Sequence, residues 1–358
     1  MTMTDRSAVA DEAPPASADG SAAGPGPTVE TVPWAHPEAT ALRDAQQAEL
    51  RARYGADDIG ADMTGEDVVA MLVLRVDGRP VGCGALRAAA ELGAGVGELK
   101  RMYVLPEHRG RGHARRLLAE LERRARALGW TRLVLETGVL QPEAMGLYVR
   151  TGYLPIDLFG PYVGVVESRC FGKDLTAVPR AVSARAGRGA LTLERVGWDH
   201  PDAAALRRRM WDDMILPRYP EAATAVEEAG GFEADDARQG VGTLSTVLAR
   251  LDGRPVGCVT LRAARDGYPD GSGELKKVFV DPSARGAGVA RRLLAAVEDD
   301  ARALGLTNVV LQAGSRQPEA VTLYVSAGYD FVVPFGPYGN DTLSLCFGKV
   351  LGSPTLPA

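Results

Sequence analysis

The sequence predicts an α/β protein built from two tandem domains of one fold, on two observations: an internal repeat and alternating periodicities within each copy. Residues 98–175 and 274–351 align without a gap, and about 43 of the 78 positions are identical. This period is far longer than that of a solenoid repeat, so each copy is expected to be a whole domain. The length of 358 residues also favours two domains over one.

The repeat sets the expected boundaries. We expect an N-terminal domain over 29–175, a linker over 176–189 and a C-terminal domain over 190–352. Residues 1–28 are rich in Ala, Gly, Pro and Ser. They carry too little apolar surface to offset the entropy of ordering the chain, and a disordered tail is predicted there.

Apolar patterns within the first copy switch between the periods of strands and helices, which favours a mixed sheet flanked by helices. Asp77-Gly78 between two apolar runs is a strong hairpin signal, and Asp252-Gly253 repeats it. In the first copy the pattern predicts strands at 68–76, 80–88, 98–104, 132–136 and 170–175, and helices at 114–128 and 141–150.

Composition excludes several classes of protein. The chain is 46% apolar and 24% charged, as in globular proteins, and its apolar runs are far shorter than the roughly 18 residues of a membrane span. A net charge of −5 gives no general attraction for nucleic acid. The four cysteines and four histidines lack the spacing of a metal site, so no metal is expected, and the cysteines are expected to be buried thiols. The N-terminus has no signal-peptide pattern, which predicts a cytoplasmic protein.

A small-residue loop precedes the predicted helix of each copy, with the sequence RGRGHA at 109–114 and RGAGVA at 285–290. Unpaired backbone amides and the helix dipole make such a helix start a site for phosphate or pyrophosphate. A Walker A loop would require G-K-[ST], which is absent, and a dinucleotide fingerprint would require a third glycine.

In both copies the loop is preceded by V-x-P and followed by R-R-L-L and, later, by L-Y-x-x-x-G-Y. With these motifs, both copies resemble the GNAT superfamily of acetyl-CoA-dependent N-acetyltransferases. Its Q/R-x-x-G-x-G/A signature falls on matching residues of both copies. The resemblance implies two GNAT-type domains, each a mixed and mostly antiparallel sheet flanked by helices, with acetyl-CoA as co-substrate. It also implies that the strand before the loop splays from its neighbour and binds pantetheine through its backbone. The expected cofactor-binding residues are Met102, Val104, Arg109, Gly110, Arg111, Gly112, His113 and Ala114, and in the second copy Val278, Val280, Arg285, Gly286, Ala287, Gly288, Val289 and Ala290.

Acetyl transfer to an amine requires a neutral nucleophile, a polarised thioester carbonyl and a proton for the departing thiolate. Glu98 and Glu274 lie 11 residues before the motif arginine, the spacing of the base in histone-acetyltransferase members, so the resemblance makes them candidate bases. The alternative is an ion-pair partner. Tyr148 and Tyr324 match the family tyrosine that donates a proton to sulfur. Their alternative is a core aromatic.

One further position differs between the copies. Glu136 lies where ribosomal-protein acetyltransferases of the superfamily carry a catalytic glutamate, whereas the second copy has Gln312. Because Gln cannot act as a base, we hypothesise that the halves differ in rate or acceptor. Arg53-Tyr54 and Arg218-Tyr219 end the first predicted helix of each copy, where they could hold a substrate carboxylate or form only surface charge.

The sequence thus predicts an acyltransferase that moves acetyl from acetyl-CoA to a primary amine in a ternary complex, with a small-molecule acceptor favoured. Three alternatives stay open: a protein or peptide acceptor, a mycothiol-synthase-like enzyme with one active half, and a non-catalytic acyl-CoA-binding protein. For assembly, a monomer and a homodimer both stay open. Neither nucleic acid nor a membrane is expected as a partner.

Overall fold

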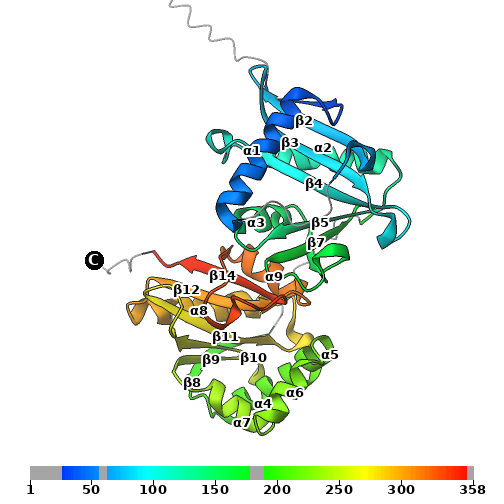
Figure 1. Ribbon diagram of the computed structural model, residues 1–358. Coiled ribbons are helices and arrows are strands. Elements are labelled where there is room, and N and C mark those ends of the chain that lie inside the picture. Colours follow the sequence, from blue (N-terminus) through cyan, green and yellow to red (C-terminus); the bar gives the residue numbers. More distant parts are fainter. Residues whose placement is uncertain (1–25, 56–62, 178–188, 353–358) are drawn as a thin grey trace, which may run out of the picture.

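The computed structural model describes residues 26–55, 63–177 and 189–352, and in this part of the chain two halves are each built on a seven-stranded mixed sheet (Figure 1). This confirms the predicted pair of α/β domains. The predicted tail at 1–28 and linker at 176–189 fall almost entirely outside the described residues. Strand β1 already begins at Thr28.

The N-terminal half has the strand order β1-β2-β3-β4-β5-β7-β6, and only β4 and β5 pair in parallel. The Asp77-Gly78 turn has φ of 49° and 76° at its two residues, the left-handed pair that a tight hairpin needs, so the predicted hairpin is confirmed. The elements are β1 (Thr28–Val32), α1 (Pro37–Tyr54), β2 (Val68–Val76), β3 (Arg79–Ala88), β4 (Val96–Val104), α2 (His113–Ala127), β5 (Arg132–Gly138), α3 (Pro142–Arg150), β6 (Leu154–Ile156) and β7 (Ser168–Asp174).

The C-terminal half repeats this order but replaces α1 by several shorter helices. A π-helical turn, Trp211–Ile215, joins the first two of them. The elements are β8 (Leu191–Val196), α4 (Pro201–Met210), α5 (Leu216–Arg218), α6 (Ala222–Glu228), α7 (Phe232–Gln239), β9 (Thr243–Leu251), β10 (Arg254–Ala263), β11 (Ser272–Val280), α8 (Val289–Ala303), β12 (Asn308–Gly314), α9 (Pro318–Ser326), β13 (Asp330–Phe331) and β14 (Ser344–Val350).

Helices cover both faces of each sheet because each helix has one apolar stripe. Helix α2 buries Leu117, Leu118 and Leu121, which recur at helical spacing, against one face of the N-terminal sheet. Helix α1 covers part of the other face, where Leu42 joins a separate cluster with Val73. The space left beside α1 on that face is where the candidate site lies.

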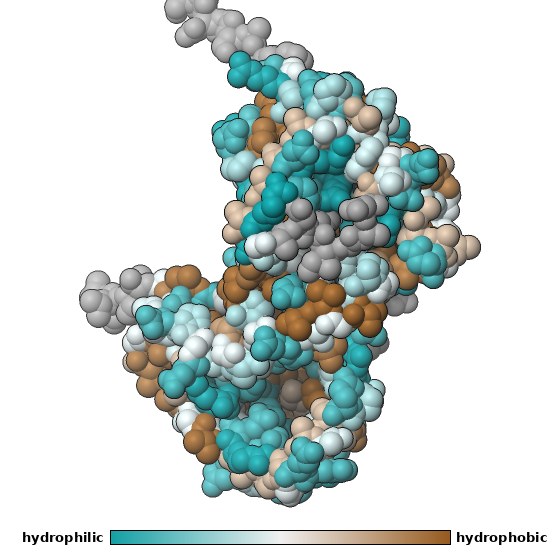
Figure 2. Space-filling model, in the orientation of Figure 1, coloured by the Kyte–Doolittle hydropathy of each residue, from teal (hydrophilic) through white to brown (hydrophobic). Residues whose placement is uncertain are grey.

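The two halves meet at the sheet edges that carry β6 and β13, with α3 and α9 beside them (Figure 1). The Phe171 and Phe331 rings stack edge to face across the junction, with centroids 6.4 Å apart. Buried apolar residues of both halves form one continuous cluster there, and apolar surface follows the line where the halves meet (Figure 2). The halves are therefore packed together and not merely tethered.

All four cysteines are free and buried, as predicted, and burial raises the pKa of the Cys83 thiol to about 12. None of the helices in the described ranges has the length and apolar character needed to cross a membrane.

Candidate active site

Strands β4 and β5 separate in the middle of the N-terminal sheet. They pair in parallel only at Val96–Leu99, although both strands continue beyond it. Directly after this segment β4 carries a β-bulge, with Arg101 at φ 57°. The C-terminal half has the same break: pairing ends at Leu275, and Lys277 lies at φ 55°. In each half the two parallel strands therefore separate at the equivalent position.

The predicted phosphate loop lies at the start of α2. Gly110 and Gly112 have φ of 75° and 80°, and Gly286 and Gly288 in the other half have 80° and 77°. A Cβ at these positions would meet no atom within 4 Å, so the left-handed backbone, rather than crowding, explains the glycines. The glycines of both loops are exposed, whereas the first residues of the helices, His113 and Val289, are buried.

A cavity of about 280 Å³ lies in the N-terminal half between α1 and the diverging strands. It is enclosed by α1, the bulged part of β4, the end of β5, the first turns of α3 and the start of β7. The lining residues are Gln46, Leu50, Tyr54, Leu99, Lys100, Arg101, Met102, Glu136, Thr137, Gly138, Gln141, Ala144, Tyr148, Glu167 and Ser168.

Glu136 and Tyr148, two of the predicted catalytic residues, both line this cavity. Oε1 of Glu136 accepts a hydrogen bond from Oγ of Ser168 at 2.7 Å. Tyr148 is nearly buried and packs on Tyr153 and Phe171, with ring centroids 5.8 and 6.4 Å away. Burial, together with the negative charge of Glu136, raises the pKa of the Tyr148 phenol, so this hydroxyl stays protonated at neutral pH.

The other predicted bases lie away from the cavity lining. The side chain of Glu98 is fully buried, and its oxygens are occupied by Nε of Arg87, Nζ of Lys100 at 3.7 Å and the Tyr162 hydroxyl at 3.4 Å. Lys100 does line the cavity, and its Nζ donates to the Tyr162 hydroxyl at 2.6 Å. Each oxygen of Glu98 already has at least one cationic or hydroxyl partner, which is the ion-pair alternative that the sequence left open.

Glu274 has the same surroundings in the C-terminal half. It is fully buried and contacts Arg262, Lys276 and the hydroxyl of Tyr338, the last at 2.7 Å. Burial by itself would raise the pKa of Glu274, but Lys276, Tyr338 and Arg262 outweigh it and lower that pKa. Burial lowers the pKa of Lys276 to about 8.

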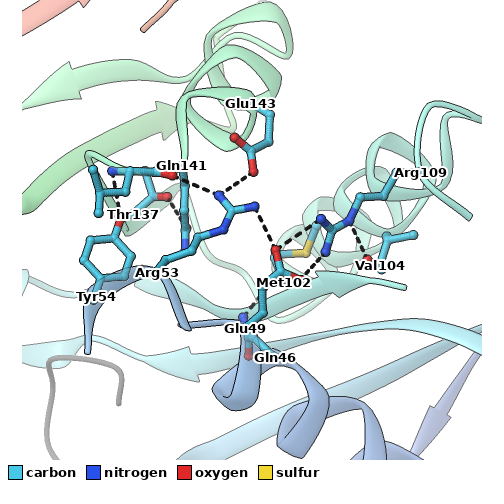
Figure 3. A network of polar contacts seen from close by, with 11 residues as sticks. Gln46, Glu49, Arg53, Tyr54, Met102, Val104, Arg109, Thr137, Gln141 and Glu143 are labelled. Carbon is cyan, nitrogen blue, oxygen red and sulfur yellow. Dashed lines mark hydrogen bonds and ion pairs between the residues drawn. The ribbon is translucent and has the colours of Figure 1, made fainter. Parts of the chain in front are cut away.

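A row of ion pairs crosses beside the cavity from the phosphate loop to α3 (Figure 3). Arg109 donates from Nη1 and Nη2 to the two oxygens of Glu49, at 3.1 and 2.6 Å. Glu49 also accepts from Arg53 at 2.8 Å, and Arg53 pairs with Glu143 at 2.7 Å. The Tyr54 hydroxyl accepts from the backbone N–H of Leu140 at 2.9 Å.

These contacts revise one sequence hypothesis. Arg53 and Tyr54 fasten the end of α1 to the loop before α3, so the guanidinium proposed for a substrate carboxylate is occupied by Glu49 and Glu143. Two backbone carbonyls expected near pantetheine are also occupied: Gln46 donates to Met102 at 3.1 Å, and Nε of Arg109 donates to Val104 at 2.9 Å (Figure 3).

The C-terminal half keeps the glycine loop and the buried tyrosine. It differs from the N-terminal half in the segment that corresponds to α1. Tyr324 is nearly buried, and burial raises its pKa. Met214 takes the place of Glu49, and its Sδ lies 3.4 Å from Nη2 of Arg285.

The model of a family described as acetyltransferase (GNAT) matches residues 34–153 and again residues 204–329. The chain belongs to the GNAT acetyltransferase family. The predicted resemblance is confirmed for both copies, and the protein is a GNAT-type acyltransferase.

Individual GNAT relatives agree with this assignment. An IAA acetyltransferase from Azospirillum brasilense is 44% identical over 105 residues, which are 29% of this chain and 67% of that protein. A mycothiol acetyltransferase from Cellulomonas flavigena is 26% identical over 285 residues, 75% of this chain and 76% of the relative.

Among solved structures, a Klebsiella pneumoniae protein provisionally named an acyl-CoA N-acyltransferase is 34% identical, with a TM-score of 0.37, and the match covers 42% of this chain and 97% of that one. A PaiA N-acetyltransferase from Thermoplasma acidophilum, solved with coenzyme A, is 14% identical, with a TM-score of 0.34, over 45% of this chain and 99% of the other.

Three residues beside the cavity were missed by the sequence reasoning. Ser168 lies in a segment repeated in both copies and could have been noticed there, since S-x-C-F-G-K recurs at 344. Gln46 and Glu49 have no such signal, because the helix that carries them is only weakly similar between the copies. Their positions depend on how α1 crosses the sheet.

Proposed function

We propose that the N-terminal half transfers an acetyl group from acetyl-CoA directly to the primary amine of a small molecule, in a ternary complex. The observation that carries this proposal is that Glu136 and Tyr148 line one cavity beside the opening between β4 and β5. Its volume of about 280 Å³ suits a small acceptor or one end of a longer one.

In the proposed reaction Glu136 accepts a proton from the acceptor ammonium, and the nitrogen lone pair then attacks the thioester carbonyl carbon. The tetrahedral intermediate collapses with loss of the carbon–sulfur bond, and Tyr148 gives its proton to the departing thiolate. The nitrogen loses its second proton, which returns the Tyr148 phenolate to phenol, and Glu136 releases its proton to solvent. The Tyr148 phenol holds its proton at neutral pH, as a proton donor must. We assign Glu136 as the base rather than Glu98 because the cavity lining includes Glu136, whereas Glu98 is enclosed by Arg87, Lys100 and Tyr162.

The start of α2 would hold the pyrophosphate of acetyl-CoA. The backbone amides of residues 110–114 and the positive end of the helix dipole would supply hydrogen bonds and partial charge. His113 would contribute through its backbone because its imidazole is buried. Residues 286–290 at the start of α8 would bind a second acetyl-CoA in the same way.

We propose that the C-terminal half has little or no acetyltransferase activity of its own. Gln312 replaces the proposed base, and Met214 faces Arg285 where Glu49 faces Arg109 in the first half. The loop and Tyr324 remain, so this half is proposed to bind acyl-CoA without rapid turnover.

The test is an assay of thiol release from acetyl-CoA with a panel of amino acids, polyamines, aminoglycosides and lysine peptides, with the acetylated product identified by mass spectrometry. We expect turnover with at least one small amine. Glu136→Gln should lower kcat about 100-fold or more, in the range that a general base contributes. Gln312→Ala, the matched control, should change kcat by less than about twofold. Wild-type kcat in Glu136→Gln would contradict the assignment of the base.

A second candidate acceptor is that of the mycothiol acetyltransferase, favoured because the similarity to that relative runs through both halves. Turnover with the amine precursor of mycothiol well above that with every amine of the panel would select this candidate.

A further inference from the structure

Arg169, at the start of β7, is an arginine buried at the junction of the two halves. Its side chain is almost wholly inaccessible, with 2% of the residue exposed. It donates to four backbone carbonyls: Val166 at 2.8 Å and Ser168 at 2.7 Å in its own half, and Asp341 at 2.7 Å and Ser344 at 2.9 Å in the other. One guanidinium therefore ties the loop before β7 to the loop before β14.

The loop before β7 is also a wall of the candidate site. Glu167 and Ser168 line the cavity, and the hydroxyl of Ser168 donates to the proposed base Glu136. Arg169 holds the carbonyls of Val166 and Ser168, which lie on either side of Glu167. The direction of the Ser168 side chain thus depends on a clamp whose other end is in the C-terminal half.

The loop before β14, whose carbonyls accept these hydrogen bonds, is itself held by contacts of its own side chains. The side chain of Asp341 accepts from the backbone N–H of Leu343 at 2.9 Å and from the Ser344 hydroxyl. These contacts fix the loop whose carbonyls face Arg169. The position equivalent to Arg169 in the second copy is Leu345, so the C-terminal half returns no matching clamp from that position.

A second cross-junction arginine comes from the opposite direction. Arg316 occupies the position of Leu140 and pairs with Asp157 of the N-terminal half at 3.0 Å. Its Nη1 also donates to the backbone carbonyl of Arg218 at 2.9 Å. Each half therefore has an arginine at the junction where the other half has a leucine. These contacts form only because two different halves are joined in one chain.

We propose that Arg169 is a positioning residue through which the C-terminal half orients Ser168, and so the base Glu136, in the acceptor cavity of the N-terminal half. The proposal rests on the proposed role of Glu136. It gives the C-terminal half a catalytic contribution that requires no turnover there.

The test measures kcat, KM and the pH profile of the full chain, with acetyl-CoA and whichever amine of the panel turns over fastest. Arg169→Leu, which copies the second half, should lower kcat about tenfold because the base is displaced. The acid limb of the kcat profile should move to higher pH, because a carboxylate that loses a hydrogen bond gains protons more readily. KM for acetyl-CoA should stay within about twofold, and Arg169→Lys should restore part of the rate.

Two variants keep the test decisive if Arg169→Leu does not fold. Asp341→Ala loosens the receiving loop from within the other half and should shift the acid limb in the same direction as Arg169→Leu. Arg150→Ala removes an exposed ion pair across the same junction, to Asp330 at 3.2 Å, and should leave both kcat and the pH profile unchanged.

An unchanged acid limb in Arg169→Leu would overturn the inference even if kcat falls. A merely structural role lowers the amount of folded enzyme without moving the pH profile. If Arg169→Leu does not fold, an unchanged acid limb in Asp341→Ala would overturn the inference in the same way. Glu136→Gln separates this failure from that of the proposed function. If Glu136→Gln is inactive and Arg169→Leu behaves as wild type, only the inference fails. If Glu136→Gln keeps wild-type kcat, the proposed base itself is wrong.

Discussion

The two halves place different side chains against the same arginine. Arg109 of the N-terminal half makes two hydrogen bonds to the carboxylate of Glu49, whereas Arg285 of the C-terminal half faces the thioether of Met214. The Glu136 position differs in the same sense, with Gln312 in the second copy. At these two positions the N-terminal half carries carboxylates and the C-terminal half carries neutral side chains.

This comparison separates two tasks within one fold. The glycine loop and the buried tyrosine are present in both halves and serve the donor side of the proposed reaction. The differences are concentrated on the acceptor side, in the segment that is helix α1 in one half and a π-helical turn with short helices in the other. The features proposed for donor binding are common to both halves, whereas the segments beside the proposed acceptor site differ.

The loop glycines give the largest expected effect. Gly112→Asp places a carboxylate where the pyrophosphate would bind. Two like charges about 5 Å apart at an effective dielectric of about 20 repel by about 3 kcal/mol, which is on the order of a 100-fold loss of acetyl-CoA affinity. Isothermal titration should then show one site fewer than in the wild type.

Two controls sharpen that experiment. Gly112→Asn has nearly the same shape and tolerates positive φ but carries no charge, so it should lose much less affinity. Gly288→Asp should remove the site of the C-terminal half and leave turnover nearly intact. A loss of turnover in Gly288→Asp equal to that in Gly112→Asp would break the proposed division between the halves.

The two tyrosines give an intermediate effect. Tyr148→Phe should lower kcat roughly 10- to 100-fold because the thiolate loses its proton donor, while the Kd of acetyl-CoA stays within about twofold. Tyr324→Phe, the matched change in the other half, should alter kcat little. Steady-state assays would measure kcat, and isothermal titration of the same preparations would measure the Kd of acetyl-CoA.

The raised pKa of Tyr148 also sets a pH prediction. A phenol acts as an acid only below its pKa, and burial and Glu136 both raise this pKa above the ordinary value of about 10. The wild-type kcat profile should therefore show no alkaline decline from this group below about pH 10. An alkaline limb near pH 8 that disappears in Tyr148→Phe would contradict the role.

The Glu49 ion pair gives the smallest effect. The hydrogen bond from Arg109 lowers the pKa of Glu49, so its contribution to stability is present at neutral pH and is lost as the pH falls through the lowered value. Because a quarter of the Glu49 side chain is exposed, Glu49→Gln should lower the free energy of unfolding by only about 0.5–1 kcal/mol at pH 7.

Urea unfolding at pH 7 and at pH 3 would measure this difference. The gap between Glu49→Gln and wild type should narrow at pH 3, because Glu49 is then protonated in the unfolded chain and part of the ion-pair contribution to stability is lost. Met214→Gln, at the same place in the other half, breaks no ion pair and should show no such pH dependence. A gap that persists at pH 3 would show that packing, and not charge, accounts for it.

Local sequence was sufficient for much of the fold and for part of the site. The Asp77-Gly78 turn forms where predicted because its two positive φ angles are set by adjacent residues. The apolar spacing of Leu117, Leu118 and Leu121 likewise fixed which face of α2 is buried. The spacing from the loop to Tyr148 was enough to bring this residue into the candidate cavity.

Glu98 shows where local sequence was insufficient. The alternation E-L-K places Glu98 and Lys100 on one face of β4 and Leu99 on the other. Tyr162, 64 residues further along the chain, packs on that face, and its hydroxyl contacts both the carboxylate and the ammonium. The choice between base and ion-pair partner depended on this remote contact.

By itself, the sequence determined the repeat, most of the strands and helices that the copies share, the glycine loop and the family, because each of these depends on neighbouring residues or on the match of one copy to the other. The tertiary structure decided which carboxylate lines the cavity and how the halves meet. Arg169 and Ser344 are 175 residues apart and touch only because two sheet edges pack together. Such a contact depends on the packing of the whole chain, which no local pattern records.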